Sequence, residues 1–198
     1  MSLYAIGRPI VASFFRLSFK LRIKGADFIP EDGPLLVCSN HRSLLDPPLI
    51  GMAMPRTLSY MAKEELFKVP LFGSLIRSLH AFPVKRGAGD RAAIRTALAI
   101  LKDNHALLMF PEGTRNRSDT LKKAMSGVGF FALHSNAAVV PCAIIGNYKC
   151  RRPLTVVFGK PIDIADMRAR GLKAAAAAAE ITAHIQTLIE ENGGQPKS

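Results

Sequence analysis

The sequence predicts a single-domain α/β fold, in which helices cover both faces of a mostly parallel sheet. Short apolar runs without alternation recur along the chain, and segments with helical periodicity separate them. Strands that are apolar throughout are typical of sheets that are covered on both faces. The length of 198 residues fits one domain that buries a sizeable core.

Each expected strand is a short apolar run, and each expected helix is a longer segment with helical periodicity. The strands are expected at residues 35–39, 58–61, 107–110, 139–145 and 154–158. The helices between them are expected at residues 47–54, 69–79, 89–104 and 127–136. A last helix contains the alanine run 174–179 and ends at Gly193 and Gly194, because glycines are frequent at helix C-termini.

The N-terminal segment, residues 1–24, is expected to form an amphipathic helix that lies in a membrane interface. Arg8, Arg16 and Lys20 interrupt its apolar run, so it does not reach the roughly 18 apolar residues that a spanning helix needs. Its phenylalanines can enter the headgroup region while the basic side chains extend to phosphates. The alternative is a helix that packs on the core of the protein itself. The remaining residues, 25–198, are expected to form one globular domain.

The composition favours anionic partners. Lysine and arginine number 27 against 15 acidic residues, which gives a formal net charge of +12. Nucleic acid, anionic lipid headgroups and an acidic carrier protein all suit such a charge. The aromatic residues are mostly phenylalanine, with no tryptophan, and basic and apolar residues are interleaved. This pattern favours an anionic membrane surface over a platform that stacks nucleic-acid bases.

The three cysteines, Cys38, Cys142 and Cys150, are odd in number and lack the spacing of a disulfide framework. They indicate reduced thiols in a cytoplasmic protein. We therefore expect a monotopic or peripheral protein on the cytoplasmic face of a membrane, without a spanning helix.

His41 and Asp46 are candidates for a catalytic base and the carboxylate that orients it. Both lie in the stretch NHRSLLD, directly after the first expected strand. On a continuous helix they would point about 140° apart, so they can meet only across a loop or a distorted helix start. The carboxylate then accepts the N–H of Nδ1 and leaves Nε2 free as a base. The alternative is an N-cap, because Asp before Pro is typical of a helix start.

A second stretch, FPEGTRNR, follows the third expected strand at residues 110–117. Gly113 allows the backbone to approach a ligand closely, and Arg115 has a planar guanidinium group suited to phosphate. Glu112 can hold an arginine in place or accept a hydrogen bond from a substrate hydroxyl. The alternative is an ordinary turn.

Two other stretches have features that predict an anion site or an irregular strand. HAFPVKRGAGDR, residues 80–91, places Lys85 and Arg86 near an expected helix start, where anions are favoured, although a solvated loop is an equal alternative. In VVPCAI, Pro141 lacks a backbone donor, which indicates an edge strand or a bulge.

In order and spacing, NHRSLLD, FPVKR, FPEGTR and VVPCAI resemble the signature of the glycerolipid acyltransferase family, specifically the 1-acylglycerol-3-phosphate acyltransferases. The resemblance covers roughly residues 25 to 160. It implies that His41 and Asp46 are the catalytic pair of an O-acyltransferase that needs no metal or cofactor. Acceptor binding is implied for Asn40, Arg86, Glu112, Gly113, Thr114 and Arg115.

One position departs from that family. Many members have a basic residue shortly before the glycine that follows the EGTR block, whereas this chain has Met125 and Ser126 before Gly127. Lys122 or Lys123 can replace the missing charge, or the acceptor can carry a different headgroup.

The resemblance implies transfer of an acyl chain from acyl-CoA or acyl carrier protein to lysophosphatidate, which gives phosphatidate. Alternatives are another lysolipid or glycerol phosphate as acceptor, and hydrolysis of the thioester by water. A basic nucleic-acid-binding protein explains the charge but assigns no role to FPEGTR or to the His–Asp pair, so no nucleic-acid partner is expected.

Overall fold

The computed structural model describes residues 3–85 and 89–193, which form one seven-stranded sheet in the order β1-β7-β6-β2-β5-β3-β4. The strands are β1 (Lys20–Lys24), β2 (Leu35–Ser39), β3 (Leu58–Lys63), β4 (Ala81–Val84), β5 (Ala106–Met109), β6 (Ala138–Gly146) and β7 (Pro153–Phe158). Every neighbouring pair is parallel except β6 and β7, which are antiparallel. The expected α/β fold with a mostly parallel sheet is confirmed.

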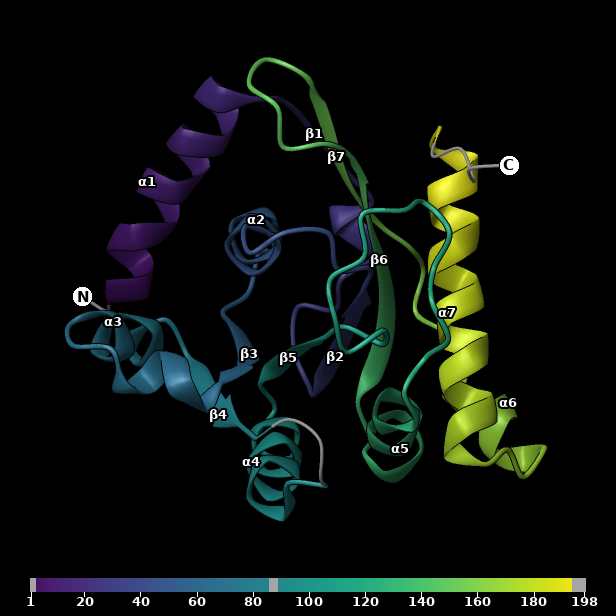
Figure 1. The fold of residues 1–198 in the computed structure, drawn as a ribbon. Coiled ribbons are helices and arrows are strands. Elements are labelled where there is room, and N and C mark those ends of the chain that lie inside the picture. Colours follow the sequence, from purple (N-terminus) through teal and green to yellow (C-terminus); the bar gives the residue numbers. More distant parts are fainter. Residues whose placement is uncertain (1–2, 86–88, 194–198) are drawn as a thin grey trace.

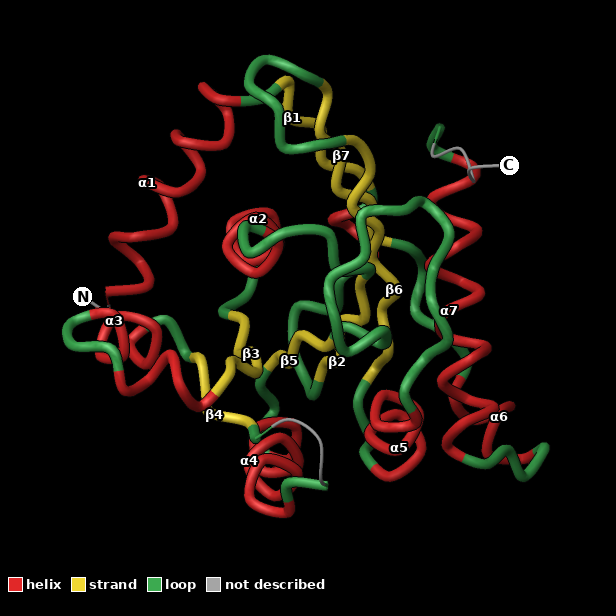
Figure 2. Tube along the Cα trace, in the orientation of Figure 1, coloured by secondary structure: helices red, strands yellow, loops and turns green. Residues whose placement is uncertain are grey.

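Helices cover both faces of the sheet (Figures 1 and 2). On one face, α1 (Leu3–Ser18) and α2 (Asp46–Ala53) contribute Phe15 and Leu49 to a core cluster with the sheet. On the other face, a second cluster contains residues of α4 (Arg91–Lys102), α5 (Ser126–His134), α6 (Ile164–Ala169) and α7 (Ala174–Glu191). In β2, Leu35 and Val37 belong to the first cluster, while Leu36 and Cys38 belong to the second. This burial on both sides explains why the strand is apolar without alternation.

The alanine run allows α7 to lie very close to α5. A Cβ atom added to Gly129 of α5 would lie 1.9 Å from the carbonyl oxygen of Ala174 and 2.7 Å from the nitrogen of Ala178. Ala177 and Ala178 are fully buried. Glycine on one helix and alanines on the other therefore bring the two backbones together, a contact that was not predicted from the sequence.

The N-terminal helix is shorter than the expected segment 1–24. α1 ends at Ser18, and Lys20–Lys24 form β1, which pairs in parallel with β7 at one edge of the sheet. The chain after the helix is therefore part of the sheet. Among the described residues, no helix has the length and apolar character to cross a bilayer.

Among the strands and α-helices, β4 and α6 were not predicted either, and one expected helix begins later than its predicted range. β4 arises from the stretch AFPV, and it tolerates Pro83 because it is the edge strand opposite β1. α6 has only one turn and a half, too short for a clear periodicity. The expected helix 69–79 begins later, as α3 (Phe72–Ser78), after a 3-10 helix at Glu64–Lys68.

Pro141 does not mark an edge strand, because β6 lies inside the sheet between β7 and β2. The carbonyl of Pro141 accepts a hydrogen bond from Gly159 on the β7 side. Regular pairing with β7 ends at Phe158, and contact with β6 resumes at an isolated bridge between Val139 and Ile162. The missing N–H thus faces an interruption of the ladder, as expected for the bulge alternative.

Candidate active site

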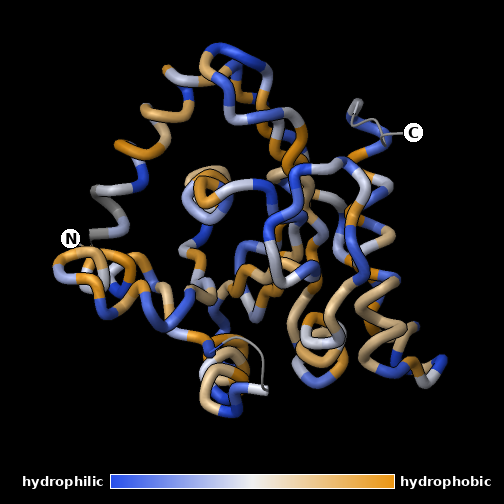
Figure 3. Tube along the Cα trace, in the orientation of Figure 1, coloured by the Kyte–Doolittle hydropathy of each residue, from blue (hydrophilic) through white to orange (hydrophobic). Residues whose placement is uncertain are grey.

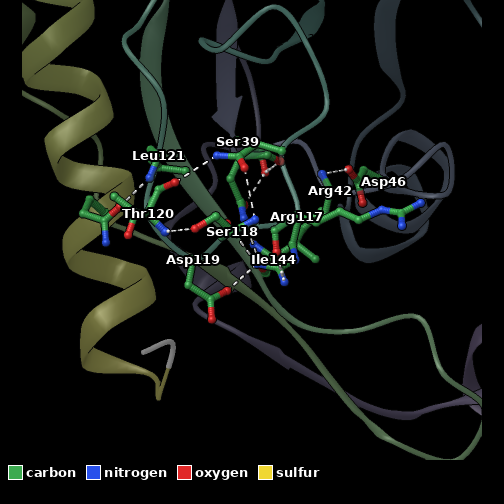
Figure 4. Close-up of polar contacts among 12 residues, drawn as sticks. Ser39, Arg42, Asp46, Arg117, Ser118, Asp119, Thr120, Leu121 and Ile144 are labelled. Carbon is green, nitrogen blue, oxygen red and sulfur yellow. Dashed lines mark hydrogen bonds and ion pairs between the residues drawn. The ribbon is translucent and has the colours of Figure 1, made fainter. Parts of the chain in front are cut away.

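The carboxyl ends of β2, β5 and β6 bring three polar loops together, because these strands are neighbours in the sheet and run parallel. The loops are residues 40–45, 110–125 and 147–152. They contain the stretches NHRSLLD and FPEGTR from the sequence analysis, and a third stretch, NYK, which directly follows β6. Figure 4 shows polar contacts of the first two loops, with Arg42, Ser118 and Asp119 among the labelled residues.

His41 and Asp46 are in direct contact, with 2.7 Å between Nδ1 and Oδ2. The segment between them is a loop, as their contact requires. The same Oδ2 accepts the backbone N–H groups of Arg42 and Ser43, at 2.5 and 2.8 Å. Asp46 is fully buried, whereas the His41 side chain is 12 % exposed. The geometry therefore leaves Nε2 of His41 as the nitrogen that can act on a substrate.

The capping alternative for Asp46 is wrong. The residue that precedes α2 is Leu45, which makes no side-chain cap, and Asp46 is the first residue inside the helix. Its carboxylate instead binds N–H groups of the preceding loop. Pro47 and Pro48 are compatible with the first turn of the helix, where free N–H groups have no helical partner in any case.

Phe110 fixes the plane of the histidine ring. The two rings are stacked with centroids 3.9 Å apart and an interplanar angle of 16°. Phe110 follows β5 directly, so this contact links the loop after β5 to the His41–Asp46 pair. No role was predicted for this phenylalanine from the sequence.

Tyr148 contacts the pair from a third direction, because its hydroxyl donates a hydrogen bond to Oδ1 of Asp46. Burial raises the pKa of the Tyr148 phenol well above its usual value, and the charge of Asp46 and the hydrogen bond to it raise it further. The phenol is therefore a neutral donor. Its position directly after a buried strand was the only signal for it in the sequence.

Asn40 does not fit the predicted role in substrate binding. Its side chain is 1 % exposed, its Nδ2 donates to the carbonyl of Ile144 at 2.9 Å, and its Oδ1 accepts the N–H of Ile144 at 2.7 Å. β2 ends one residue earlier, at Ser39. The amide therefore continues the ladder between β2 and β6 in the way that a peptide group would.

Backbone and side-chain contacts hold the first two loops together. The carbonyl of His41 accepts the N–H of Asn116 at 2.6 Å. The Arg42 guanidinium forms an ion pair with Asp119 and donates to the carbonyls of Arg117 and Ser118 (Figure 4). These contacts fix the position of the FPEGTR loop relative to His41 and Arg42.

Glu112 is buried and does not hold an arginine. Its Oε2 accepts hydrogen bonds from Nδ2 of Asn116 at 2.8 Å and from the N–H of Lys122 at 2.9 Å. Its Oε1 is buried without a hydrogen-bond partner among the described residues. The first alternative for Glu112 is therefore wrong, and the second, a hydrogen bond with substrate, stays a prediction.

Gly113, Thr114 and Arg115 form the tip of the same loop. Gly113 has φ = 65°, and a Cβ atom on it would lie 2.2 Å from the sulfur of Met125. A side chain there is therefore excluded both by the backbone conformation and by the methionine. Thr114 and Arg115 are exposed, and Met125 is 62 % exposed. The position that departs from the family thus lies against the loop that carries Arg115.

The FPVKR stretch lies at a different strand. Arg86 is outside the described residues. Lys85 follows β4, and its N–H donates to Asp90, which also caps α4 by accepting the N–H groups of Ala92 and Ala93. These hydrogen bonds lower the pKa of the Asp90 carboxyl.

A small apolar groove lies between α1, α2 and β3. Gly7 and Val11 line it on α1, Gly51 on α2 and Tyr60 on β3. Pro47 and Pro48, which directly follow Asp46, also line it. The groove therefore reaches the first turn of α2, the helix that begins with Asp46.

Buried thiols near the pair are not nucleophiles. Burial raises the pKa of the Cys142 thiol to about 12, and it raises that of Cys38 further. Across residues 3–85 and 89–193, no three His, Cys, Asp or Glu side chains are grouped so that they could hold a metal ion.

Comparison with known proteins gives one consistent family. The sequence profile of the family described as "Acyltransferase" matches residues 20–145. A 1-acyl-sn-glycerol-3-phosphate acyltransferase of Bacillus subtilis is 28 % identical over 152 residues, which cover 74 % of this chain and 75 % of the relative. A lyso-ornithine lipid O-acyltransferase of Pseudomonas aeruginosa is 35 % identical over 129 residues, or 65 % of this chain and 48 % of the relative.

A solved structure has the same fold. The crystal structure of the 1-acyl-sn-glycerophosphate acyltransferase PlsC of Thermotoga maritima superposes with a TM-score of 0.79, at 23 % sequence identity. The match covers 99 % of this chain and 82 % of that chain. Among the sequence relatives, the 1-acyl-sn-glycerol-3-phosphate acyltransferase of Streptococcus pneumoniae is matched over only 62 % of its length.

We predict that Asn40 is needed for stability and not for substrate affinity. Asn40→Ala leaves the buried N–H and carbonyl of Ile144 without partners, so the free energy of unfolding should fall by about 3 kcal/mol. Urea denaturation measures this loss, and Asn136→Ala, at an exposed asparagine, is the control. A variant with unchanged stability and a raised KM would restore the predicted role in binding.

Proposed function

The chain belongs to the acyltransferase family, and on that premise we propose that it transfers a fatty acyl chain from a thioester to the free hydroxyl of lysophosphatidate, which gives phosphatidate. The observation that carries the proposal is the His41–Asp46 contact at the carboxyl end of β2. It provides a base of fixed orientation, held between a buried carboxylate and the ring of Phe110.

In the proposed reaction, Nε2 of His41 removes the proton from the acceptor hydroxyl while the oxygen attacks the thioester carbonyl. The new C–O bond forms, the C–S bond breaks, and the imidazolium returns the proton to the departing thiolate. Asp46 holds the N–H of Nδ1 and stabilises the imidazolium. The substrate brings its own nucleophile, so the enzyme needs no covalent intermediate.

The acyl chain is proposed to occupy the apolar groove between α1, α2 and β3. Its lining is almost entirely apolar, and the prolines at its edge directly follow Asp46. A chain that lies there has its thioester end near the catalytic pair. Leu79, the residue that follows α3, also lines this groove.

The donor is proposed to be acyl-CoA or acyl carrier protein. Both are acidic, and the net charge of +12 suits either. The proposal requires no metal or other cofactor, because the base and the nucleophile are both accounted for.

We predict that His41→Ala lowers kcat by about 10²–10⁴-fold, which is the usual contribution of a general base. The measurement is acyl transfer to lysophosphatidate, with acyl-CoA and acyl carrier protein as donors in separate assays. His105→Ala, at an exposed histidine before β5, is the matched control and should keep full activity. A folded His41→Ala enzyme with near-normal turnover would exclude the mechanism. Thioester consumption without any acceptor would instead favour a hydrolase.

Recognition of the acceptor is proposed for the tip of the FPEGTR loop and for Arg86. Arg115 and Thr114 are exposed at the same end of the sheet as His41, and the ion pair of Arg42 with Asp119 anchors their loop. A guanidinium group binds phosphate through two parallel hydrogen bonds. The buried Oε1 of Glu112 is a further acceptor for a substrate hydroxyl.

Lyso-ornithine lipid is the second candidate for the acceptor. The Pseudomonas relative that is 35 % identical carries that activity in its name, and Met125 stands where many lysophosphatidate enzymes have a basic residue. An ornithine headgroup contains no phosphate, so its recognition does not require a basic residue at this position.

The two acceptors predict different results for Arg115→Ala. With lysophosphatidate, the loss of a phosphate contact should raise the KM of the acceptor by about 10- to 100-fold and leave the KM of the thioester unchanged. With lyso-ornithine lipid, the KM should change little. Steady-state kinetics with both acceptors decides between them, and Arg95→Ala on the exposed face of α4 is the control. Equal effects on donor and acceptor would contradict a phosphate-binding role.

The protein is proposed to act at an anionic membrane surface. Ile10, Phe14 and Leu17 form an exposed apolar stripe on α1, opposite the buried Phe15 and Phe19. Positions four and three residues apart share one face of a helix, so this stripe is continuous. Figure 3 shows hydrophobic positions along α1 and in the segment that leads into α3.

A second apolar surface lies at the start of α3. Leu71 is 89 % exposed with φ = 61°, and Val69, Phe72 and Leu75 are also exposed. The end of α3 and the first turns of α1 are close together, since a Cβ atom on Gly7 would lie 3.9 Å from the side chain of Leu79. Both surfaces therefore belong to one side of the molecule (Figure 1).

Basic side chains flank these surfaces. Arg16 and Lys20 are exposed beside the stripe, and Lys68 and Arg77 are exposed beside Leu71. Apolar residues that insert among headgroups and cations that pair with phosphates are the two components of interfacial binding. The free cysteines fit a reducing compartment, so we place the enzyme on the cytoplasmic face, as a monotopic or peripheral protein.

We predict that the protein binds anionic vesicles at low salt and that Leu17→Asp together with Leu71→Asp abolishes this binding. Charged residues at exposed positions of an interfacial surface cost insertion energy but do not disturb the core. Vesicle flotation in low and high salt measures binding, and Leu44→Asp, at another exposed leucine, is the control. Unchanged flotation of the double variant would exclude this surface. A gel shift with nucleic acid tests the remaining alternative for the basic charge.

A further inference from the structure

We propose that Tyr148 is a positioning residue, whose hydroxyl holds the Asp46 carboxylate and thereby sets the orientation and basicity of His41. The inference rests on the proposed function, since it concerns the same base. Tyr148 lies in the loop after β6, whereas His41 and Asp46 come from the segment after β2. The tyrosine therefore contacts Asp46 from a different part of the chain than His41 does.

The geometry divides the carboxylate between two sets of donors. Oδ2 accepts Nδ1–H of His41 and the N–H groups of Arg42 and Ser43, whereas Oδ1 accepts the hydroxyl of Tyr148. The two oxygens of a carboxylate fix its plane when both are bound. Without the hydroxyl, the carboxylate is free to rotate about the Cβ–Cγ bond, and the direction of its bond to Nδ1 is less defined.

The ring of Tyr148 is held independently of its hydroxyl. It lies edge-to-face against Phe19, with centroids 5.8 Å apart, and Phe19 packs on Phe15 at 5.8 Å. Both phenylalanines belong to the corner where α1 meets β1. Packing therefore holds the phenol ring in place. Little conformational entropy is lost when its hydroxyl forms the hydrogen bond to Oδ1.

The hydroxyl also reduces the charge that Asp46 presents to His41. A hydrogen bond to one oxygen of a carboxylate stabilises its negative charge, so the attraction of the other oxygen for an imidazolium is weaker. The remaining titratable groups around Asp46 are the Arg42 guanidinium, which is paired with Asp119, and the buried thiol of Cys142. Neither changes when only the phenol oxygen is removed.

The test is Tyr148→Phe, which deletes the hydroxyl and keeps the ring against Phe19. More negative charge on Asp46 favours the imidazolium, so the base loses its proton only at higher pH. We expect the acidic limb of the pH profile of kcat/KM to move up by about half a pH unit, and kcat to fall about tenfold. The KM values of both substrates should not change.

A second measurement does not depend on activity. The NMR signals of the His41 ring report its titration directly, and their midpoint should move upward in Tyr148→Phe by the same amount. Incorporation of 3-fluorotyrosine at position 148 keeps every packing contact but makes the phenol a stronger donor, so it should move the midpoint in the opposite direction. Thr187→Val, which removes a hydroxyl on α7 that bonds the carbonyl of Ala183, is the control and should leave both profiles unchanged.

The outcomes separate this inference from the proposed function. If Tyr148→Phe lowers only the urea midpoint and leaves the pH profile and the His41 titration in place, the residue is merely structural and the inference is wrong. Shifts in the same direction for both variants would also overturn it. If His41→Ala itself stays active, the proposed function fails, whatever the titration shows.

Discussion

The site depends on a single buried carboxylate. Asp46 has no exposed surface, and an ionised group in such a place is tolerated only when hydrogen bonds replace its water. Two N–H groups of its own loop, the ring of His41 and the hydroxyl of Tyr148 meet this need. The requirement bends the loop after β2, leaves Nε2 of the histidine free of the carboxylate, and brings the loop after β6 to the same point.

The sheet could be predicted because its signal is local. β2 is apolar at every position, since its two faces contact different core clusters, and such a run indicates a doubly covered strand. β1 could not be predicted in this way. Lys20, Arg22 and Lys24 give it a polar, exposed character, and it is a strand only because β7 offers an edge with which to pair. The sequence of a short segment does not indicate which distant strand it pairs with.

The site was predictable only in part, for a related reason. His41 and Asp46 are near in sequence, so their spacing could suggest a pair. Tyr148 acts on Asp46 from 102 positions away, and Phe110 stacks on His41 from another strand. The structural contacts of Asn40 were not predicted, because an asparagine next to a histidine gives no hint that its amide continues a strand ladder.

The loop after β5 has a part that is held by hydrogen bonds and an exposed tip. Hydrogen bonds hold most of this loop in place. The side chain of Asn116 donates to Glu112 and to the carbonyl of Thr120, and Gln186 of α7 accepts the N–H of Leu121. The tip with Thr114 and Arg115 projects from this frame into solvent. Under the proposed function, substitutions at the tip would alter which headgroup is accepted and would leave the contact between His41 and Asp46 intact. The acceptor could then change in evolution without a loss of the proposed base.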